Sequence, residues 1–221
     1  MHRSRLVVLV ALGWCLSGSP VMSQSFDLVR FDTQDGGSIE AAWFAACKNK
    51  AVIFAHGAIY DKESWYFLAQ ALQEQGVSAL AIDFRGYGDS KAGNSLRKMY
   101  DILGAVAWLE KQGLEDISIV GASMGGAAVL TALAQEPVPI SKVVLLAPAG
   151  GPALASASID KLFVVSRDED LYNRVMAIYE ASVEPKTIKV YPGSAHAQHL
   201  FDTAERDDLI ARITGFIGSG S

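Results

Sequence analysis

Six short apolar runs, rich in valine and isoleucine, constrain the fold of this chain more than any other feature. They hardly alternate between apolar and polar residues, which is the pattern of strands covered on both faces. Strands of this kind belong to parallel sheets, whose crossovers are usually helices. The runs occupy residues 51–57, 77–84, 117–123, 142–148, 161–166 and 187–193.

Segments with helical periodicity separate these runs. Residues 64–75 and 95–112 place apolar side chains on one face, and each segment is followed by a glycine, a common helix stop. We expect Ser64 and Ser95 to lie at their N-termini as caps. Three further helices are expected at residues 124–135, 171–182 and 203–217.

An alternating segment precedes the first buried run. Residues 26–46 alternate around Asp35-Gly36-Gly37, and Asp-Gly between two such stretches is a strong hairpin signal. A hairpin followed by alternating strands and helices predicts an α/β fold, with a mostly parallel sheet covered by helices on both faces.

Residues 1–23 differ from the rest of the chain. A basic start, an apolar run and a small, polar stretch follow each other, as in a secretory signal peptide. We expect cleavage after Ser23, with Ser19 as an alternative, and a secreted or periplasmic single domain over residues 24–221. The apolar run is shorter than the roughly 20 residues of a spanning helix, so no stable membrane insertion is expected after cleavage.

Composition narrows the classes of function. The chain has 221 residues, 50% of them hydrophobic, which suits one domain with its own core. A net charge of −5 offers no basic surface, so no nucleic-acid partner is expected. Cys15 leaves with the signal segment, and Cys47 is expected at a buried or edge-strand position without a disulfide. Four histidines and one remaining cysteine give no metal-ligand spacing, and no cofactor is predicted.

The stretch GASMGG, residues 121–126, lies where a buried strand passes into a helix. One interpretation is packing, because small residues let a helix lie close to a sheet. The other is chemical: Gly121-x-Ser123-x-Gly125 is the pattern of a nucleophile elbow, which exposes a serine above the sheet. The strand-turn-helix setting favours the chemical interpretation.

A nucleophilic serine needs a base, usually a histidine held by a carboxylate. An elbow serine is followed in the chain first by the acid and then by the histidine. His196 follows the last strand directly and is the predicted base, while His199 is expected at the surface or behind the site. His56 precedes the elbow and is expected to organise its own loop.

The acid is expected after the apolar run that ends at residue 166, where three carboxylates are consecutive. Asp168 is the predicted acid, and Glu169 and Asp170 remain open as alternatives. The tetrahedral intermediate also needs backbone donors. The N–H groups of Met124 and Ala58 are predicted for this role, with Ile59 as an alternative to Ala58.

Four blocks resemble, in their order, those of the α/β-hydrolase superfamily: FAHGA (54–58), DFRGYGDS (83–90), GASMGG (121–126) and PGSAH (192–196). The likeness covers roughly residues 26–217. It implies a sheet of about eight strands and a serine hydrolase that uses Ser123, an acid near Asp168, and His196. DFRGYGDS is a structural turn in that family, so we assign it no catalytic role. The chain departs from the family at Ser166, which replaces the usual glycine before the acid.

The resemblance also predicts an open site. Lidded relatives insert a helical domain after the strand that corresponds to residues 142–148, but here only AGGPALASASID (149–160) precedes the next strand. Twelve residues are too few for a lid, so no cap domain is expected. Trp65 is expected in the core rather than at the mouth of the site.

The leading functional prediction is a small serine hydrolase that cleaves carboxylic esters of small molecules through an acyl-enzyme. A thioesterase or a peptidase would use the same residues, because a fold and a triad do not select the substrate. A non-catalytic binding or accessory protein on the same fold is the alternative from another class, and an incomplete triad would favour it.

Overall fold

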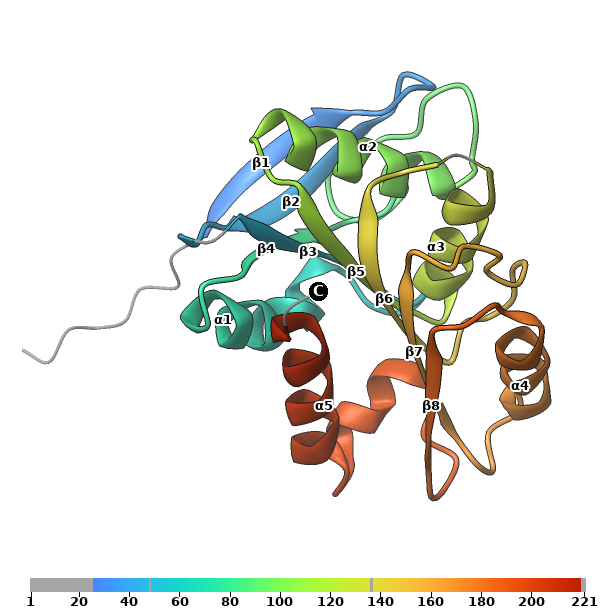
Figure 1. Cartoon of the computed structure of the whole chain (residues 1–221). Coiled ribbons are helices and arrows are strands. Elements are labelled where there is room, and N and C mark those ends of the chain that lie inside the picture. Colours follow the sequence, from blue (N-terminus) through green and yellow to red (C-terminus); the bar gives the residue numbers. More distant parts are fainter. Residues whose placement is uncertain (1–25, 48, 136, 220–221) are drawn as a thin grey trace, which may run out of the picture.

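The computed structural model describes residues 26–47, 49–135 and 137–219. Within these residues, eight strands form one sheet in the order β1-β2-β4-β3-β5-β6-β7-β8 (Figure 1). The predicted mostly parallel sheet is therefore confirmed. The expected signal peptide, residues 1–23, and Cys15 lie outside the described residues.

The first two strands form the predicted hairpin. β1 (Asp27–Asp32) pairs antiparallel with β2 (Ser38–Phe44), and β2 pairs antiparallel with β4. All other neighbours in the sheet pair parallel. The parallel strands are β3 (Lys50–Ala55), β4 (Ser78–Ile82), β5 (Asp116–Ala122), β6 (Ile140–Leu146), β7 (Asp160–Ser166) and β8 (Lys186–Tyr191).

Helices cover both faces of the sheet (Figure 1). On one face lie α1 (Tyr66–Glu74) and α5 (Arg206–Gly218), which share a buried apolar cluster. The other face carries α2 (Met99–Lys111), α3 (Met124–Gln135) and α4 (Tyr172–Ala181) over a second cluster. Two short 3₁₀ turns, η1 (Lys62–Trp65) and η2 (Ala197–Asp202), precede α1 and α5. In the described part of the chain, no helix is both long and apolar enough to cross a membrane.

Both predicted caps are wrong. Ser64 lies inside η1, whose N-terminus is capped by the Asp61 carboxylate. Ser95 lies outside α2, which begins at Met99. For Ser95 the reason is tertiary. Its carbonyl accepts a hydrogen bond from Arg85 at 2.5 Å, and its N–H donates to Asp35. These bonds hold the chain before Met99 as a loop.

Two further expectations concern single side chains. Trp65 is fully buried and stacks on Phe54 with 5.1 Å between ring centroids, so its place in the core is confirmed. The expected position of Cys47 is wrong. It is exposed and follows the end of β2.

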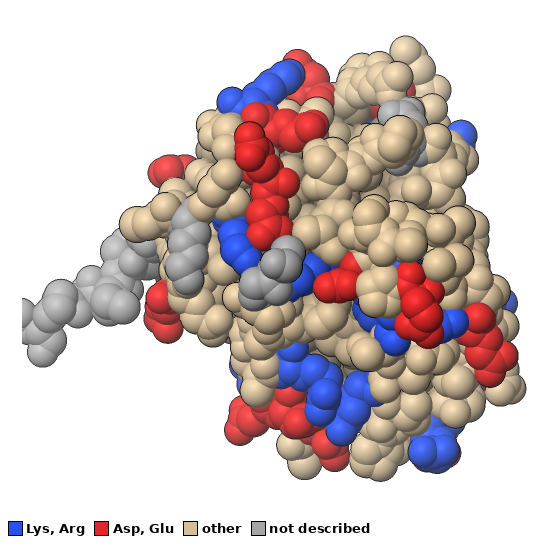
Figure 2. Space-filling model, in the orientation of Figure 1, with Lys and Arg blue, Asp and Glu red and all other residues tan. Residues whose placement is uncertain are grey.

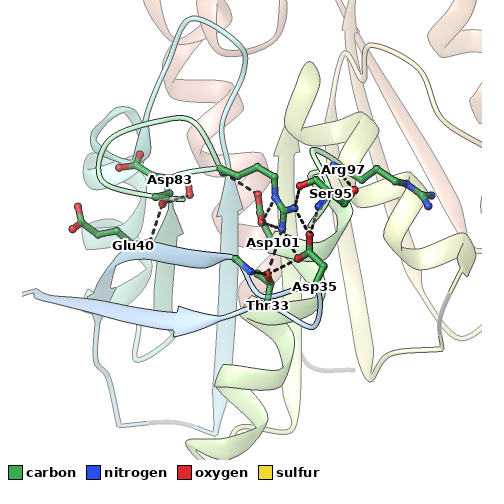
Figure 3. A network of polar contacts seen from close by, with 10 residues as sticks. Thr33, Asp35, Glu40, Asp83, Ser95, Arg97 and Asp101 are labelled. Carbon is green, nitrogen blue, oxygen red and sulfur yellow. Dashed lines mark hydrogen bonds and ion pairs between the residues drawn. The ribbon is translucent and has the colours of Figure 1, made fainter. Parts of the chain in front are cut away.

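A buried ion network joins the hairpin turn, the loop after β4 and α2 (Figure 3). Its centre is the Arg85 guanidinium, whose side chain is 1% exposed. This group donates to Asp101 Oδ1 at 2.8 Å and to Asp35 Oδ2 at 2.7 Å. The hydrogen bond from Arg85 holds the pKa of Asp35 well below its usual range. The turn of the hairpin is thus fixed to the loop that follows β4.

A second network connects η1 and β2 with the start of the loop that follows β4. Lys62 Nζ lies 2.6 Å from Asp83 Oδ2 and 3.0 Å from Glu40 Oε1. Burial opposes the charge on Lys62, but its bonds to the two carboxylates outweigh this effect and raise its pKa. Asp83 and Glu40 are labelled in Figure 3. Both networks position loops that lie at the carboxyl ends of the strands.

The Asp35→Asn variant tests the first network. At pH 7 it is expected to lower the free energy of unfolding by about 3 kcal/mol, because it leaves a buried guanidinium with one carboxylate fewer. Since the folded pKa of Asp35 is depressed, its contribution is present above the unfolded value of 3.8 and lost at lower pH. The difference between the two proteins should therefore shrink below about pH 4, as measured by urea denaturation.

Asp89→Asn is the matched control, because Asp89 is 79% exposed and lies 3.4 Å from Arg30. An exposed pair contributes little, so this change should leave the unfolding free energy nearly constant at every pH. Equal losses in the two variants would contradict the structural role of the Arg85 network.

Candidate active site

Ser123 lies on the turn between β5 and α3, at the carboxyl edge of the sheet. Its φ of 49° is in the left-handed region, which an L-residue adopts only when the surroundings hold it there. The Ser123 N–H donates to the Leu146 carbonyl at 2.9 Å, which ties the turn to the end of β6. This is the backbone conformation that the Gly-x-Ser-x-Gly pattern predicts.

The glycine at 125 is required by close packing. A Cβ built there would lie 2.2 Å from the Ala55 carbonyl oxygen and 2.8 Å from that of His56. Neither atom belongs to a flexible side chain, so any larger residue would push α3 away from β3. The packing and chemical interpretations of this stretch are therefore compatible: the glycines bring the helix close, and the serine projects from the resulting turn.

His196 reaches the serine from the loop between β8 and η2. Its Nε2 lies 2.8 Å from Ser123 Oγ, a distance at which the hydroxyl donates to the ring nitrogen. The structure thus brings together the two residues predicted as nucleophile and base, although 73 positions separate them.

The carboxylate beside His196 is Glu169, not Asp168. His196 Nδ1 donates to Glu169 Oε2 at 2.5 Å, and the glutamate side chain is 2% exposed. The prediction of Asp168 is therefore wrong, and the alternative Glu169 takes its place. Asp168 and Asp170 are both exposed.

The turn that follows β7 decides between the two residues, because the strand and its pairing with β8 end at Ser166. In this turn the Asp168 N–H donates to the Gly193 carbonyl at 2.9 Å, and the side chain of Asp168 is exposed. Glu169 then faces inward, where the Ser166 N–H donates to its Oε1 at 2.9 Å.

Ser166, which departs from the family pattern, has a contact that sequence reasoning missed. Its hydroxyl donates to the Ala195 carbonyl at 2.5 Å, next to His196. One residue therefore holds the acid through its N–H and the histidine loop through its side chain. A polar residue in place of the usual glycine was the only sequence signal of this role.

The loop after β3 lies directly against Ser123. A Cβ at Gly57 would be 3.6 Å from Ser123 Cβ. Ala58, whose N–H is a predicted oxyanion donor, and Ile59, its alternative, both line a cavity of about 210 Å³. Ser123 and His196 line the same cavity. Met124 is the first residue of α3, whose first intrahelical bond runs from the Ala127 N–H to the Ser123 carbonyl.

His56 organises this loop, as expected. Its Nδ1–H donates to the Gly57 carbonyl at 2.8 Å, and the Phe84 N–H donates to its Nε2 at 3.1 Å. Burial lowers the pKa of His56, which favours the neutral ring that this pattern requires. Both ring nitrogens are engaged, so His56 has no nitrogen left for a reacting group.

Tyr60 and His199 also line the cavity beside Ser123. The Tyr60 hydroxyl lies 3.0 Å from His199 Nδ1, and His199 is exposed, as predicted. A larger hollow of about 500 Å³ lies beyond His196, lined in part by Asp168 and Asp170, but Ser123 does not line it. The smaller cavity is therefore the one next to the serine hydroxyl.

The residues between β6 and β7, all of which the structure describes, contain no helix. Acidic and basic side chains are interspersed on the face shown in Figure 2, without a broad area of one sign. Within the described ranges, no three side chains of His, Cys, Asp or Glu gather in a way that would hold a metal ion.

Comparisons with known sequences place this geometry in context. A family model described as the alpha/beta hydrolase fold matches residues 50–177. An uncharacterized protein of Mycobacterium tuberculosis is 25% identical over 245 residues, which cover 96% of this chain and 87% of the relative. A Mycoplasma pneumoniae protein named as an esterase/lipase is 33% identical over 133 residues, or 55% of this chain and 46% of that protein.

Solved structures share the fold at low sequence identity. An esterase from Exiguobacterium antarcticum superposes with a TM-score of 0.70 at 14% identity, covering 86% of this chain and 99% of the esterase. The Pyrococcus furiosus esterase Pf2001 also gives 0.70, at 17% identity, with 87% and 90% covered. At such identity these likenesses establish the architecture alone.

The Glu169→Gln variant tests which carboxylate acts on His196. It is expected to lower the rate of Ser123 labelling by a fluorophosphonate about 10²- to 10⁴-fold, because an amide neither fixes the ring tautomer nor stabilises the imidazolium. Asp168→Asn is the matched control and should change this rate less than about threefold, since its carboxylate is exposed. The opposite ranking of the two variants would restore Asp168 as the acid.

Proposed function

The chain belongs to the α/β-hydrolase family and is an esterase-like hydrolase, and on this premise we propose that it cleaves carboxylic esters of small molecules through a covalent acyl-enzyme. The observation that carries the proposal is the continuous series of hydrogen bonds from Ser123 through His196 to Glu169. Each member has the chemistry its position requires: a hydroxyl, an imidazole and a buried carboxylate.

Acylation begins when Ser123 Oγ attacks the ester carbonyl carbon. His196 Nε2 takes the hydroxyl proton, and Glu169 stabilises the imidazolium that forms. Negative charge develops on the carbonyl oxygen, and the N–H groups of Ala58 and Met124 donate to it, each worth about 3 kcal/mol. The carbon–oxygen bond then breaks, and His196 returns the proton to the departing alcohol.

Deacylation repeats these steps with water. His196 Nε2 takes a proton from the water molecule, and the resulting hydroxide attacks the acyl carbon. The bond to Ser123 Oγ breaks, the serine regains its proton from His196, and a carboxylic acid leaves. One ester and one water thus give one alcohol and one acid, with every residue returned to its starting state.

The size of the cavity supports a small acyl group. Its volume of about 210 Å³ is below the range of about 300–1,000 Å³ typical of sites for drug-sized ligands. Among the described residues no helix is inserted between β6 and β7, which would leave room for the alcohol portion of a substrate beside Ser123. A thioester would follow the same steps, so oxygen esters and thioesters of the same acid are both to be assayed.

The decisive test uses a fluorophosphonate and p-nitrophenyl esters of short acids. The native protein should take one label per chain, and Ser123→Ala should take none. Ser123→Ala and His196→Ala should each lower kcat by about 10⁶, because members of a triad act as a unit. Ser158→Ala, a change at an exposed serine of the loop before β7, should retain labelling and turnover. A folded native protein that takes no label would overturn the catalytic proposal in favour of a binding role.

Export to the periplasm or the medium is part of the proposal. It is supported by the sequence of residues 1–23, with a basic start, an apolar run and a small, polar stretch. Expression of the full chain in a bacterial host, followed by N-terminal sequencing of the exported fraction, should give Gln24 as the first residue. A product that keeps Met1 and stays in the cytoplasm would contradict export without affecting the catalytic proposal.

A further inference from the structure

Three successive peptide groups of the loop after β3 are each held by a different side chain. The first is the His56–Gly57 peptide, whose N–H donates to Gln198 Oε1 at 2.7 Å. Gln198 belongs to η2 and is 4% exposed, and its Nε2 donates to Ser64 Oγ at 2.8 Å. Both ends of this buried amide are therefore engaged, and its orientation is fixed.

The second peptide group joins Gly57 to Ala58. Its carbonyl accepts from His56 Nδ1–H at 2.8 Å and from the Tyr60 N–H at 3.1 Å. A peptide group is planar and trans, so its N–H points away from its carbonyl. The bonds to the Gly57 carbonyl therefore fix the direction of the Ala58 N–H, for which the described residues provide no acceptor.

The third peptide group joins Ala58 to Ile59, and Tyr87 holds it. The Tyr87 hydroxyl donates to the Ala58 carbonyl at 2.9 Å and lies 3.6 Å from Met124 Sδ. The Tyr87 ring packs edge-on against His56 at 4.7 Å and under Lys98 Nζ at 5.6 Å. This tyrosine comes from the DFRGYGDS turn, to which no role in the chemistry was assigned.

We infer that Gln198 and Tyr87 are positioning residues that clamp the Ala58 N–H in the direction of the developing oxyanion. Gln198 removes the Gly57 N–H as a competing donor, and Tyr87 stops the following peptide from rotating. The inference rests on the proposed function and adds two residues to its machinery.

The clamp also connects the segment that carries His196 with the loop after β3. Gln198 lies two residues after His196, so the segment that carries the base holds the donor loop as well. Tyr87 touches both Ala58 and Met124, the two predicted sources of donors. Donors fixed before the reaction cost no reorganisation in the transition state, whereas a misplacement of about 1 Å costs about 10²-fold in rate.

The variants Gln198→Met and Tyr87→Phe remove the two contacts with little change in volume. Each is expected to lower kcat for a short ester about ten- to a hundredfold with KM nearly constant, because the donors act mainly in the transition state. The Ki of a trifluoromethyl ketone, whose serine adduct carries an oxyanion, should rise by the same factor as kcat/KM falls. The Ki of the product carboxylate and the pH–rate profile should not change, because His196 keeps its contacts.

Two matched controls separate positioning from stability. Tyr191→Phe removes the hydroxyl of a buried tyrosine at the end of β8, which donates to Asp208 of α5 at 2.6 Å. Gln73→Met exchanges an amide on α1 that donates to the Ala45 carbonyl. Both controls should keep kcat and the ketone Ki, whatever they do to the melting temperature.

The outcomes distinguish this inference from the function on which it rests. Clamp variants that lose melting temperature but keep kcat and the ketone Ki would overturn the clamp and leave the esterase proposal intact. A rise in KM alone would do the same. Should Gln198→Met fail to fold, Tyr87→Phe decides by the same two criteria. A native protein without label or turnover would overturn the proposed function, and the clamp with it.

Discussion

The close approach of α3 to the end of β3 is the constraint on which the rest of the site depends. Gly125 lies so near the Ala55 and His56 carbonyls that no side chain fits between the helix and the strand. Two residues earlier, the Ser123 backbone has a φ of 49°, in the left-handed region that an L-residue adopts only when its surroundings hold it there. The loop at Gly57 lies beside the same serine, so the proposed nucleophile and the loop proposed to donate to the oxyanion are close neighbours of this contact.

Buried charge stabilises the loops around that contact. Lys62 offsets Asp83 and Glu40, while Arg85 offsets Asp35 and Asp101. Removing a single partner from such a group leaves a charge without compensation in a poorly solvated place. Asp83 and Arg85 form the base of the DFRGYGDS turn, and its tip presents Tyr87 to the donor loop. The turn therefore carries buried ion pairs and, through Tyr87, also contacts the loop that is proposed to donate to the oxyanion.

Much of the architecture could be predicted because it depends on local pattern. Apolar runs without alternation mark the six parallel strands, and Asp-Gly marks the hairpin, so both appear where expected. One wrong prediction occurs where a distant group intervenes. Ser95 has the residue type of a cap, but Arg85 and Asp35 bind its backbone first. Cys47 lies just past the end of β2, where a shift of a few residues separates buried from exposed positions.

The sequence alone determined which residue types meet at the site: a serine after the third parallel strand of the chain, a carboxylate after the fifth, and a histidine after the sixth. Their order is covalent, and the parallel sheet brings all strand ends to one edge. Only the tertiary structure decided that Glu169, and not Asp168, contacts His196. That choice depends on the turn after Ser166, in which the Asp168 side chain is exposed and the Glu169 carboxylate contacts His196. The contacts of Gln198 and Tyr87 with the loop after β3 could not be predicted either, because they join residues that are close only after folding.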